Sequence, residues 1–161
     1  MHVELLYYGL CVLVSAVVFL CVGFWYVRPR MDASPLPQAL IPLLLFSGFR
    51  VNGLFFIVAG IAAPDIPMGF ALPTAIGDAA SACIAVIAAI ALHRGSSFGV
   101  PLAWTYNVLG SLDLVVALSS VAIYGVLPRQ FGATWVLPTI NVPALVVAHM
   151  LMLSTLARRK R

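Results

Sequence analysis

The sequence predicts an all-α protein, a polytopic transmembrane helical bundle of five spans. Apolar residues make up 63% of the 161-residue chain, charged residues make up only 9%, and the mean hydropathy is +1.08. Soluble domains carry about 25% charged residues, so this chain lacks the charge needed to cover a surface in water. A helix that crosses a bilayer needs ~20 apolar residues, and five such runs use most of the chain. We therefore expect residues 1–161 to form a single integral membrane domain.

The first two apolar runs are separated by a short polar segment. The first run, residues 5–26, has no ionisable group near its centre. The segment 27–38 contains two arginines, an aspartate and three prolines, and is expected to form an exposed loop. The second run, residues 39–63, ends at Pro64 and Pro67.

The last three runs are also bounded by turn-forming residues. The third, residues 70–92, ends before a turn rich in glycine and serine, and the fourth covers residues 100–126. The fifth, residues 134–157, contains Pro143, which lacks a backbone donor and leaves the carbonyl of Thr139 without a partner. Such a carbonyl is tolerated only where it faces protein or a wet cavity. The fifth span therefore contains either a simple kink or a break that faces a ligand.

Basic residues are distributed unevenly between the two ends of the predicted bundle. The end opposite the N-terminus carries seven of them, whereas the N-terminal end carries Arg129 together with Glu4 and Asp65. Because cytoplasmic loops are enriched in lysine and arginine, the N-terminus is predicted to lie outside and the C-terminus in the cytoplasm. Anionic lipid headgroups are the expected partners of the basic tail, and no nucleic acid is expected. The seven residues are Arg28, Arg30, Arg94, Arg158, Arg159, Lys160 and Arg161.

Three charged residues fall inside the predicted spans, and they are the strongest candidates for a functional site. Arg50, Asp78 and Asp113 lie on three different spans at similar depth. A charge at the centre of a bilayer costs ~2.5–3.5 kcal/mol on insertion scales, so these side chains are expected to meet in the interior of the bundle. Small or polar residues share their helix faces, as Tyr106 and Gly110 do for Asp113, and small residues let helices approach closely.

Two interpretations of this cluster are open. In one, Arg50 pairs with the aspartates as a structural salt bridge, because its planar fork can serve two carboxylates. In the other, the cluster lines a path or a binding site. One aspartate would then titrate or bind a cation, because two acids for one base leave a carboxylate without a permanent partner. Four further polar residues lie within the spans and complete the predicted polar core: Asn52, Asn107, Asn141 and His149.

Motifs of catalysis and metal binding are absent from the sequence. There is no GxSxG, HExxH or P-loop, so no catalytic residue is predicted. His149 is either a packed side chain or a ligand, and the different depth of His93 disfavours a pair of haem ligands. Cys11, Cys21 and Cys83 fall in apolar runs and are expected to be small buried residues, with no metal site.

Three segments resemble a known group of proteins. They are GFRVNGLFF at residues 48–56, ALPTAIGD at residues 71–78, and WTYN at 104–107 followed by LDL at 112–114. In these segments the chain resembles uncharacterised small bacterial multi-pass membrane proteins, over about its last two-thirds. The resemblance implies a protein of the bacterial inner membrane, and it brings no activity or cofactor. The order of arginine, glycine and phenylalanine in the second span also resembles that of DoxX-like four-helix proteins.

Three functions are compatible with these observations. The leading hypothesis is a small transporter, channel or proton-conducting protein whose polar core contains Arg50, Asp78 and Asp113. The second is a binder of haem, quinone or another lipophilic ligand, based on His149, the interrupted fifth span and the aromatic residues. The third is an accessory or structural subunit without activity of its own. A homo-oligomer or a larger membrane complex is also compatible with the sequence, because glycine- and alanine-rich helix faces are available for packing.

Overall fold

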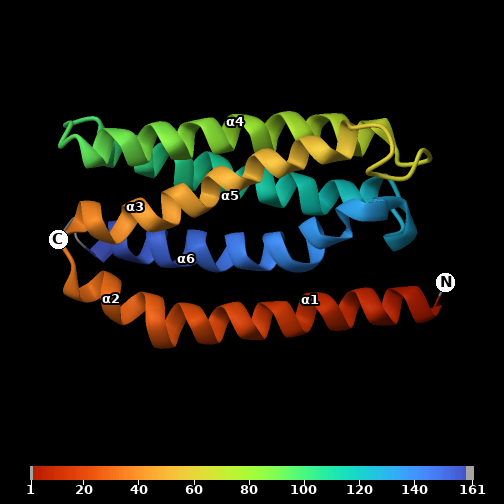
Figure 1. Cartoon of the computed structure of the whole chain (residues 1–161), viewed down its shortest axis with the longest axis horizontal. Coiled ribbons are helices and arrows are strands. Elements are labelled where there is room, and N and C mark those ends of the chain that lie inside the picture. The colour runs from red at the N-terminus through yellow and green to blue at the C-terminus, as the bar shows by residue number, and fades with distance from the viewer. Residues whose placement is uncertain (1, 159–161) are drawn as a thin grey trace.

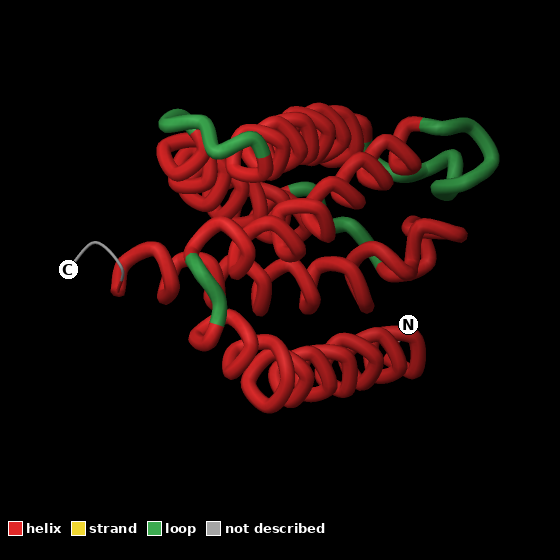
Figure 2. Tube along the Cα trace, turned by 60° about the vertical axis from the view of Figure 1, so that its left-hand side comes forward, coloured by secondary structure: helices red, strands yellow, loops and turns green. Residues whose placement is uncertain are grey.

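The computed structural model describes residues 2–158, which form helices joined by short loops (Figures 1 and 2). Five helical segments are long and apolar enough to cross a membrane. They run side by side along the long axis of the molecule, and the loops gather at its two ends (Figure 1). The prediction of an all-helical protein with five such helices is therefore confirmed. The five segments are Val3–Ala33, Leu36–Ile57, Met68–His93, Gly99–Ile123 and Leu137–Arg158.

The first segment is longer than the sequence pattern predicted. Helix α1 (His2–Val22) continues through a π-helical turn, η1 (Gly23–Val27), into α2 (Arg28–Ala33). The prediction of an exposed loop over residues 27–38 is therefore wrong. Only two residues separate α2 from helix α3 (Leu36–Ser47).

Two local interactions explain why the polar segment stays helical. The Nε–H of Arg28 donates to Oδ2 of Asp32 at 3.1 Å, an i,i+4 pair of the kind that stabilises helices. Pro29 lies in the first turn of α2, where its missing donor is harmless. The helix ends where Ser34 adopts an extended backbone before Pro35, as residues that precede proline prefer.

The second segment changes helix type halfway along its length. Helix α3 continues into η2, a 3₁₀ helix of ten residues (Gly48–Ile57). Such runs are uncommon beyond three or four residues, and they align side chains three residues apart. Arg50, Gly53 and Phe56 accordingly share one face, and all three are buried. With ~1.5 Å of rise per α-helical residue and ~2.0 Å per 3₁₀ residue, the 22 residues extend over ~38 Å.

The third and fourth segments are regular α-helices. Helix α4 (Met68–His93) contacts α3, η2 and α5 (Gly99–Ile123), and it runs along one side of the bundle (Figure 1). A row of alanines on its buried side lets these neighbours approach. Both helices begin within two residues of the predicted starts.

The fifth segment absorbs its prolines by widening the helix. A 3₁₀ helix, η3 (Pro128–Trp135), leads into a π-helical turn, η4 (Leu137–Asn141), and then into α6 (Val142–Arg158). The N–H of Val142 donates to the carbonyl of Leu137, five residues back. The π-turn thus changes the backbone register one residue before Pro143, whose missing N–H would interrupt an ordinary α-helix. The irregularity of the fifth segment is therefore a π-bulge, and Pro143 is its cause.

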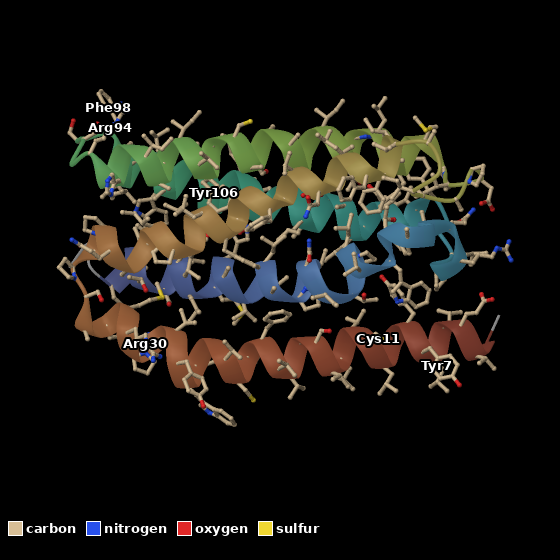
Figure 3. All side chains as sticks on the ribbon, in the orientation of Figure 1. Tyr7, Cys11, Arg30, Arg94, Phe98 and Tyr106 are labelled. Carbon is tan, nitrogen blue, oxygen red and sulfur yellow. The ribbon has the colours of Figure 1, made fainter. Side chains whose placement is uncertain are left out.

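Separate contacts fasten the two ends of the bundle. At the end that carries the C-terminus, Arg158 donates to Asp32 at 2.8 Å and Arg28 donates to Ser154 at 3.0 Å, which ties the first segment to the last. Arg30 and Arg94 lie at the same end (Figure 3). Arg159, Lys160 and Arg161, predicted to meet lipid headgroups, lie outside the described residues.

At the opposite end, the loop of residues 58–67 pairs with η3. The N–H of Ala63 donates to the carbonyl of Gln130 at 3.1 Å, and the N–H of Ala133 donates to that of Ile61 at 2.8 Å. The predicted extension of the second span to residue 63 is wrong, because the helix ends at Ile57 and Val58 is already extended.

The expectation that all three cysteines are buried is also wrong. Cys11 and Cys83 are exposed on the outside of the bundle, and Cys21 is half-buried. Apolar runs do not reveal which side of a helix faces its neighbours, and these two residues lie on the outward sides of α1 and α4.

We predict that Gly23 is needed for the contact between the first and last segments. A Cβ at this position would lie 2.7 Å from Cγ1 of Val147, so leucine there would force the helices apart. Overpacking of this kind costs about 1–3 kcal/mol. Gly23→Leu should lower the midpoint of thermal unfolding in detergent by several degrees. Gly9→Leu is the matched control, because no atom lies within 4 Å of a Cβ at Gly9. Equal midpoints for the two variants would contradict the prediction.

Candidate functional site

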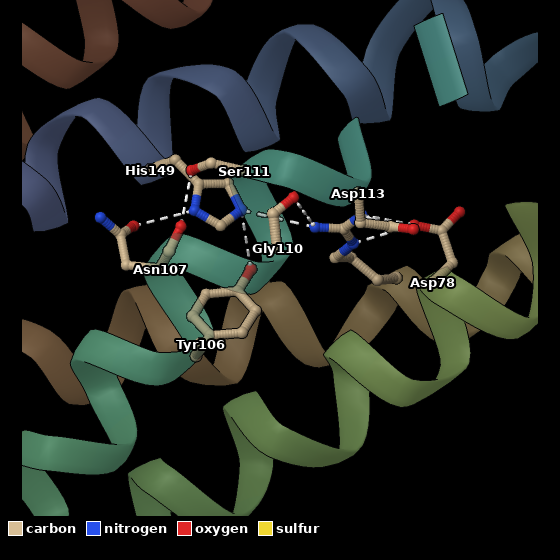
Figure 4. A network of polar contacts seen from close by, with 8 residues as sticks. Asp78, Tyr106, Asn107, Gly110, Ser111, Asp113 and His149 are labelled. Carbon is tan, nitrogen blue, oxygen red and sulfur yellow. Dashed lines mark hydrogen bonds and ion pairs between the residues drawn. The ribbon is translucent and has the colours of Figure 1, made fainter. Parts of the chain in front are cut away.

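A network of polar side chains lies in the middle of the bundle, between two apolar cores (Figure 4). The network draws on four elements: η2, α4, α5 and α6. The core at the C-terminal end contains Leu40, Leu44, Ala85, Ala88, Leu151 and Met152. The core at the N-terminal end is rich in aromatic residues and contains Phe56, Phe70, Phe131 and Leu137.

Arg50 is the centre of the network, and its side chain is fully buried. Its Nε donates to Oδ1 of Asp78 at 2.8 Å, and its Nη2 donates to Oδ2 of Asp113 and forms an ion pair with Oδ1 of Asp78 at 2.8 Å. Its Nη1 donates to the carbonyl of Gly110 at 2.9 Å and faces Nε2 of His149 at 3.4 Å. Each of the three guanidinium nitrogens therefore has an acceptor within the protein.

The two carboxylates are only half engaged. Asp78 and Asp113 each offer one oxygen to Arg50. Within the described part of the chain, Oδ2 of Asp78 and Oδ1 of Asp113 have no hydrogen-bond partner. The aspartate side chains are 17% and 20% exposed, whereas that of Arg50 is 0% exposed. With all three groups ionised the cluster carries a formal charge of −1, and its two free oxygens lie close to Gly53 and Gly77.

His149 extends the network toward the C-terminal end. Its Nδ1 lies 2.8 Å from Oδ1 of Asn107, and its Nε2 lies 3.2 Å from the hydroxyl of Tyr106, whose ring stacks on the imidazole. Because the guanidinium of Arg50 can only donate, the Nε2 that faces it accepts. The proton therefore lies on Nδ1 and is donated to Asn107, which makes His149 a neutral histidine with both nitrogens in use.

Three glycines make room for these groups. A Cβ at Gly53 would lie 2.3 Å from Oδ2 of Asp78, and a Cβ at Gly77 would lie 1.9 Å from Oδ1 of Asp113. At Gly110 a Cβ would lie 2.8 Å from Cε1 of His149. Each glycine thus allows the backbone of one helix to approach a polar side chain of another.

A cavity lies between the cluster and the N-terminal end of the bundle. Arg50 and Asp78 line it at the end nearer the centre, and its other walls are mostly apolar. The aromatic side chains of Tyr8, Phe56, Phe70 and Phe131 belong to these walls and contact one another, with ring centroids 5.3–6.1 Å apart. Beyond the cluster, in the other direction, lies the closely packed C-terminal core.

A second cavity opens between the second and fifth segments. Arg50, Asn141, Phe49 and Leu145 line both cavities. Asn141 belongs to the π-turn η4, so the irregular backbone of the fifth segment faces the cavities.

The structure brings most of the predicted polar residues together. Arg50, Asp78 and Asp113 are in direct contact, and His149 and Asn107 join them through Nη1 of Arg50. Two others contact no member of the cluster directly. Asn141 lines both cavities, and Asn52 lines the lateral one.

The contributors to the network that were not predicted as site residues include Gly110, whose carbonyl accepts a hydrogen bond from Arg50, and also Tyr106 and Gly77. The sequence placed Tyr106 on the same helix face as Asp113. The spacing of residues along one helix cannot predict its hydrogen bond with His149, which lies on another helix. Gly77 directly precedes Asp78, and it accommodates Asp113 of the neighbouring helix. Within residues 2–158, no group of three or more histidine, cysteine, aspartate or glutamate side chains is placed to hold a metal ion.

We predict that Gly77 is required for the contact of Asp113 with Arg50. Gly77→Ala places a methyl group against Oδ1 of Asp113, so the carboxylate must move or the helices must separate. The midpoint of thermal unfolding should fall by an amount that corresponds to about 1–3 kcal/mol. In an Asp113→Ala background the same substitution should cost less, because the clashing oxygen is gone. Additive effects of the two substitutions would show that the predicted clash does not occur.

Comparison with known proteins assigns the chain to a family. No curated protein and no solved structure matches it. A family model described as a domain of unknown function, DUF8737, matches residues 7–157. This agrees with the resemblance to uncharacterised proteins, while the likeness to DoxX-like proteins stays a prediction. Since the match covers almost the whole chain, the protein belongs to the DUF8737 family.

Proposed function

We propose that this protein is a multi-pass membrane protein that binds a small lipophilic molecule in its central cavity. The observation that carries the proposal is the form of the cavity, which has apolar and aromatic walls and one charged end formed by Arg50 and Asp78. Ligand sites are typically concave and mostly apolar, with a few polar groups that fix the orientation of the ligand. An intramembrane ionisable residue is by default a candidate for function.

The proposed orientation follows from the charges at the two ends. Arg28, Arg30, Arg94 and Arg158 lie at the end that carries the C-terminus, and we place this end in the cytoplasm. The N-terminus and the aromatic part of the cavity then lie toward the outside. The inner membrane of a bacterium, which the sequence resemblance implies, is the proposed location. Anionic headgroups are the proposed partners of the basic end.

The geometry argues against haem as the ligand. Both ring nitrogens of His149 face other side chains, so ligation of an iron atom would break the contact with Asn107 or those with Arg50 and Tyr106. His149 is also separated from the cavity by Arg50, and it is not among the cavity-lining residues. A lipophilic organic molecule is therefore the proposed ligand.

We predict that filling the cavity abolishes binding. Ala117 of α5 lines the cavity, so Ala117→Phe should occupy the space of the ligand. Native mass spectrometry of the purified protein should detect one retained small molecule per chain, and the retained fraction should fall at least tenfold in this variant. Ala122→Phe is the matched control, because Ala122 is exposed on the same helix and does not line the cavity. Equal retention in both variants would refute a ligand in this cavity.

Movement of protons or small cations is a second candidate function. It is favoured by the continuous polar chain from the cavity through Arg50 to His149, and by the excess carboxylate of the cluster. Chains of acidic and histidine side chains are typical of proton relays in membranes. An accessory subunit without activity is the third candidate. It would use the cluster only as a clasp between helices, and a stoichiometric partner that co-purifies with the chain would support it.

We predict that the two aspartates are needed if the protein moves ions. Asp78→Asn and Asp113→Asn each leave one carboxylate for Arg50 and remove the excess negative charge. Either substitution should reduce flux of protons or small cations into proteoliposomes at least tenfold relative to the unaltered protein. Flux that is unchanged in both variants, or absent from the unaltered protein, would eliminate the transport candidate and leave the binding proposal standing.

A further inference from the structure

We propose that the ligand of the central cavity is a lipophilic cation, which is held by the free carboxylate oxygen of Asp78 and by the aromatic rings of the cavity wall. This inference rests on the proposed function, because it names the chemical class of the molecule that the cavity takes. Three features of the site support it: the charge of the cluster, the acceptors that already engage the nitrogens of Arg50, and the arrangement of the aromatic rings.

The charge of the cluster favours a positive ligand. When both carboxyl groups are ionised, Asp78 and Asp113 together carry two negative charges, and Arg50 supplies one positive charge. His149 adds none, because its Nε2 accepts a hydrogen bond and only its Nδ1 carries a proton. One negative charge is left uncompensated in a mostly apolar environment, where an isolated charge is unfavourable. A cation in the cavity would neutralise it.

The contacts of the cluster disfavour an anionic ligand. Each of the three guanidinium nitrogens of Arg50 already has an acceptor within the protein, and both aspartates form ion pairs with it. An anion would have to displace Asp78 or Asp113 from its ion pair, and a displaced buried charge is costly. What the site can offer is an acceptor, because Oδ2 of Asp78 has no partner among the described residues. An ammonium, phosphonium or other cationic head complements it.

The aromatic rings form the second half of the proposed site. Tyr8, Phe56, Phe70 and Phe131 come from four different elements and line the same cavity as Asp78. The faces of aromatic rings attract cations, and groups of rings commonly recognise quaternary ammonium groups. They also offer a large apolar surface for the hydrophobic part of a ligand. A molecule that is both cationic and lipophilic therefore suits the two ends of the cavity at once.

The lateral cavity offers such a molecule a route. It opens between the second and fifth segments and shares Arg50 and Asn141 with the central cavity. Its rim includes Phe49, which is 62% exposed on the outside of the bundle. In a membrane this rim would face lipid, from which a lipophilic cation can reach the cluster without passing through water.

The test uses three probes of similar shape and different charge on the full chain in a neutral detergent. Tetraphenylphosphonium is the cation, triphenylphosphine oxide the neutral probe and tetraphenylborate the anion, and isothermal titration calorimetry measures their binding. The cation should bind one per chain, at least tenfold more tightly than either of the other probes. Its affinity should fall at least tenfold in Asp78→Asn. Glu4→Gln is the control, because it removes the same charge from an exposed position outside the cavity.

The outcomes separate this inference from the proposal on which it rests. If the neutral or anionic probe binds as tightly as the cation, and Ala117→Phe abolishes that binding, the cavity binds ligands but the inference is overturned. If no probe distinguishes the unaltered protein from Ala117→Phe, both proposals are rejected. Should Asp78→Asn fail to fold, the comparison of the three probes on the unaltered protein still decides, because it needs no variant in the cluster.

Discussion

The rest of this structure depends on the interactions of the Arg50 guanidinium, which is fully buried among four helical elements. A buried ionic group is tolerated only with good geometry and with every donor satisfied. Its three nitrogens contact acceptors on α4, α5 and α6 at one depth, and these contacts fix the positions of the three helices along their axes relative to η2. The glycines opposite Asp78, Asp113 and His149 are a consequence, because the helices must approach closely for the acceptors to reach the guanidinium.

The irregular backbone of the bundle serves the same cluster. The 3₁₀ helix η2 aligns Arg50, Gly53 and Phe56 along one buried face, which an α-helix would spread over about 120° because its residues turn by 100° and not 120°. The π-turn η4 brings Asn141 to the cavities as it accommodates Pro143. Non-helical backbone at membrane depth is tolerated where it is buried or lines a cavity, and both irregular segments meet this condition. The backbone departs from the α-helix beside the charged groups, where regular geometry would not assemble them.

The sequence predicted what depends on local composition and missed what depends on contacts between segments. Five apolar runs were sufficient for five helices, and the cost of charge in an apolar interior singled out Arg50, Asp78 and Asp113. The loop expected over residues 27–38 failed because polar residues alone do not end a helix, and here the pair of Arg28 and Asp32 supports one. The 3₁₀ form of η2 and the cavity could not be predicted, because both arise from how the segments pack against one another.

The shape of the site distinguishes binding from passage. The central cavity ends at Arg50 and Asp78, and the core beyond it, with Leu44, Ala88 and Met152 fully buried, leaves the cluster accessible from the cavity side. The proposed ligand would lie in this cavity, on one side of the cluster. Passage to the other end requires a rearrangement of that core. Conversion of η2 to an α-helix would shorten it by ~5 Å and turn Phe56 away from the face of Arg50, so it would separate the aromatic wall from the charged end. Binding uses the arrangement as it stands, and for this reason it is the better supported function.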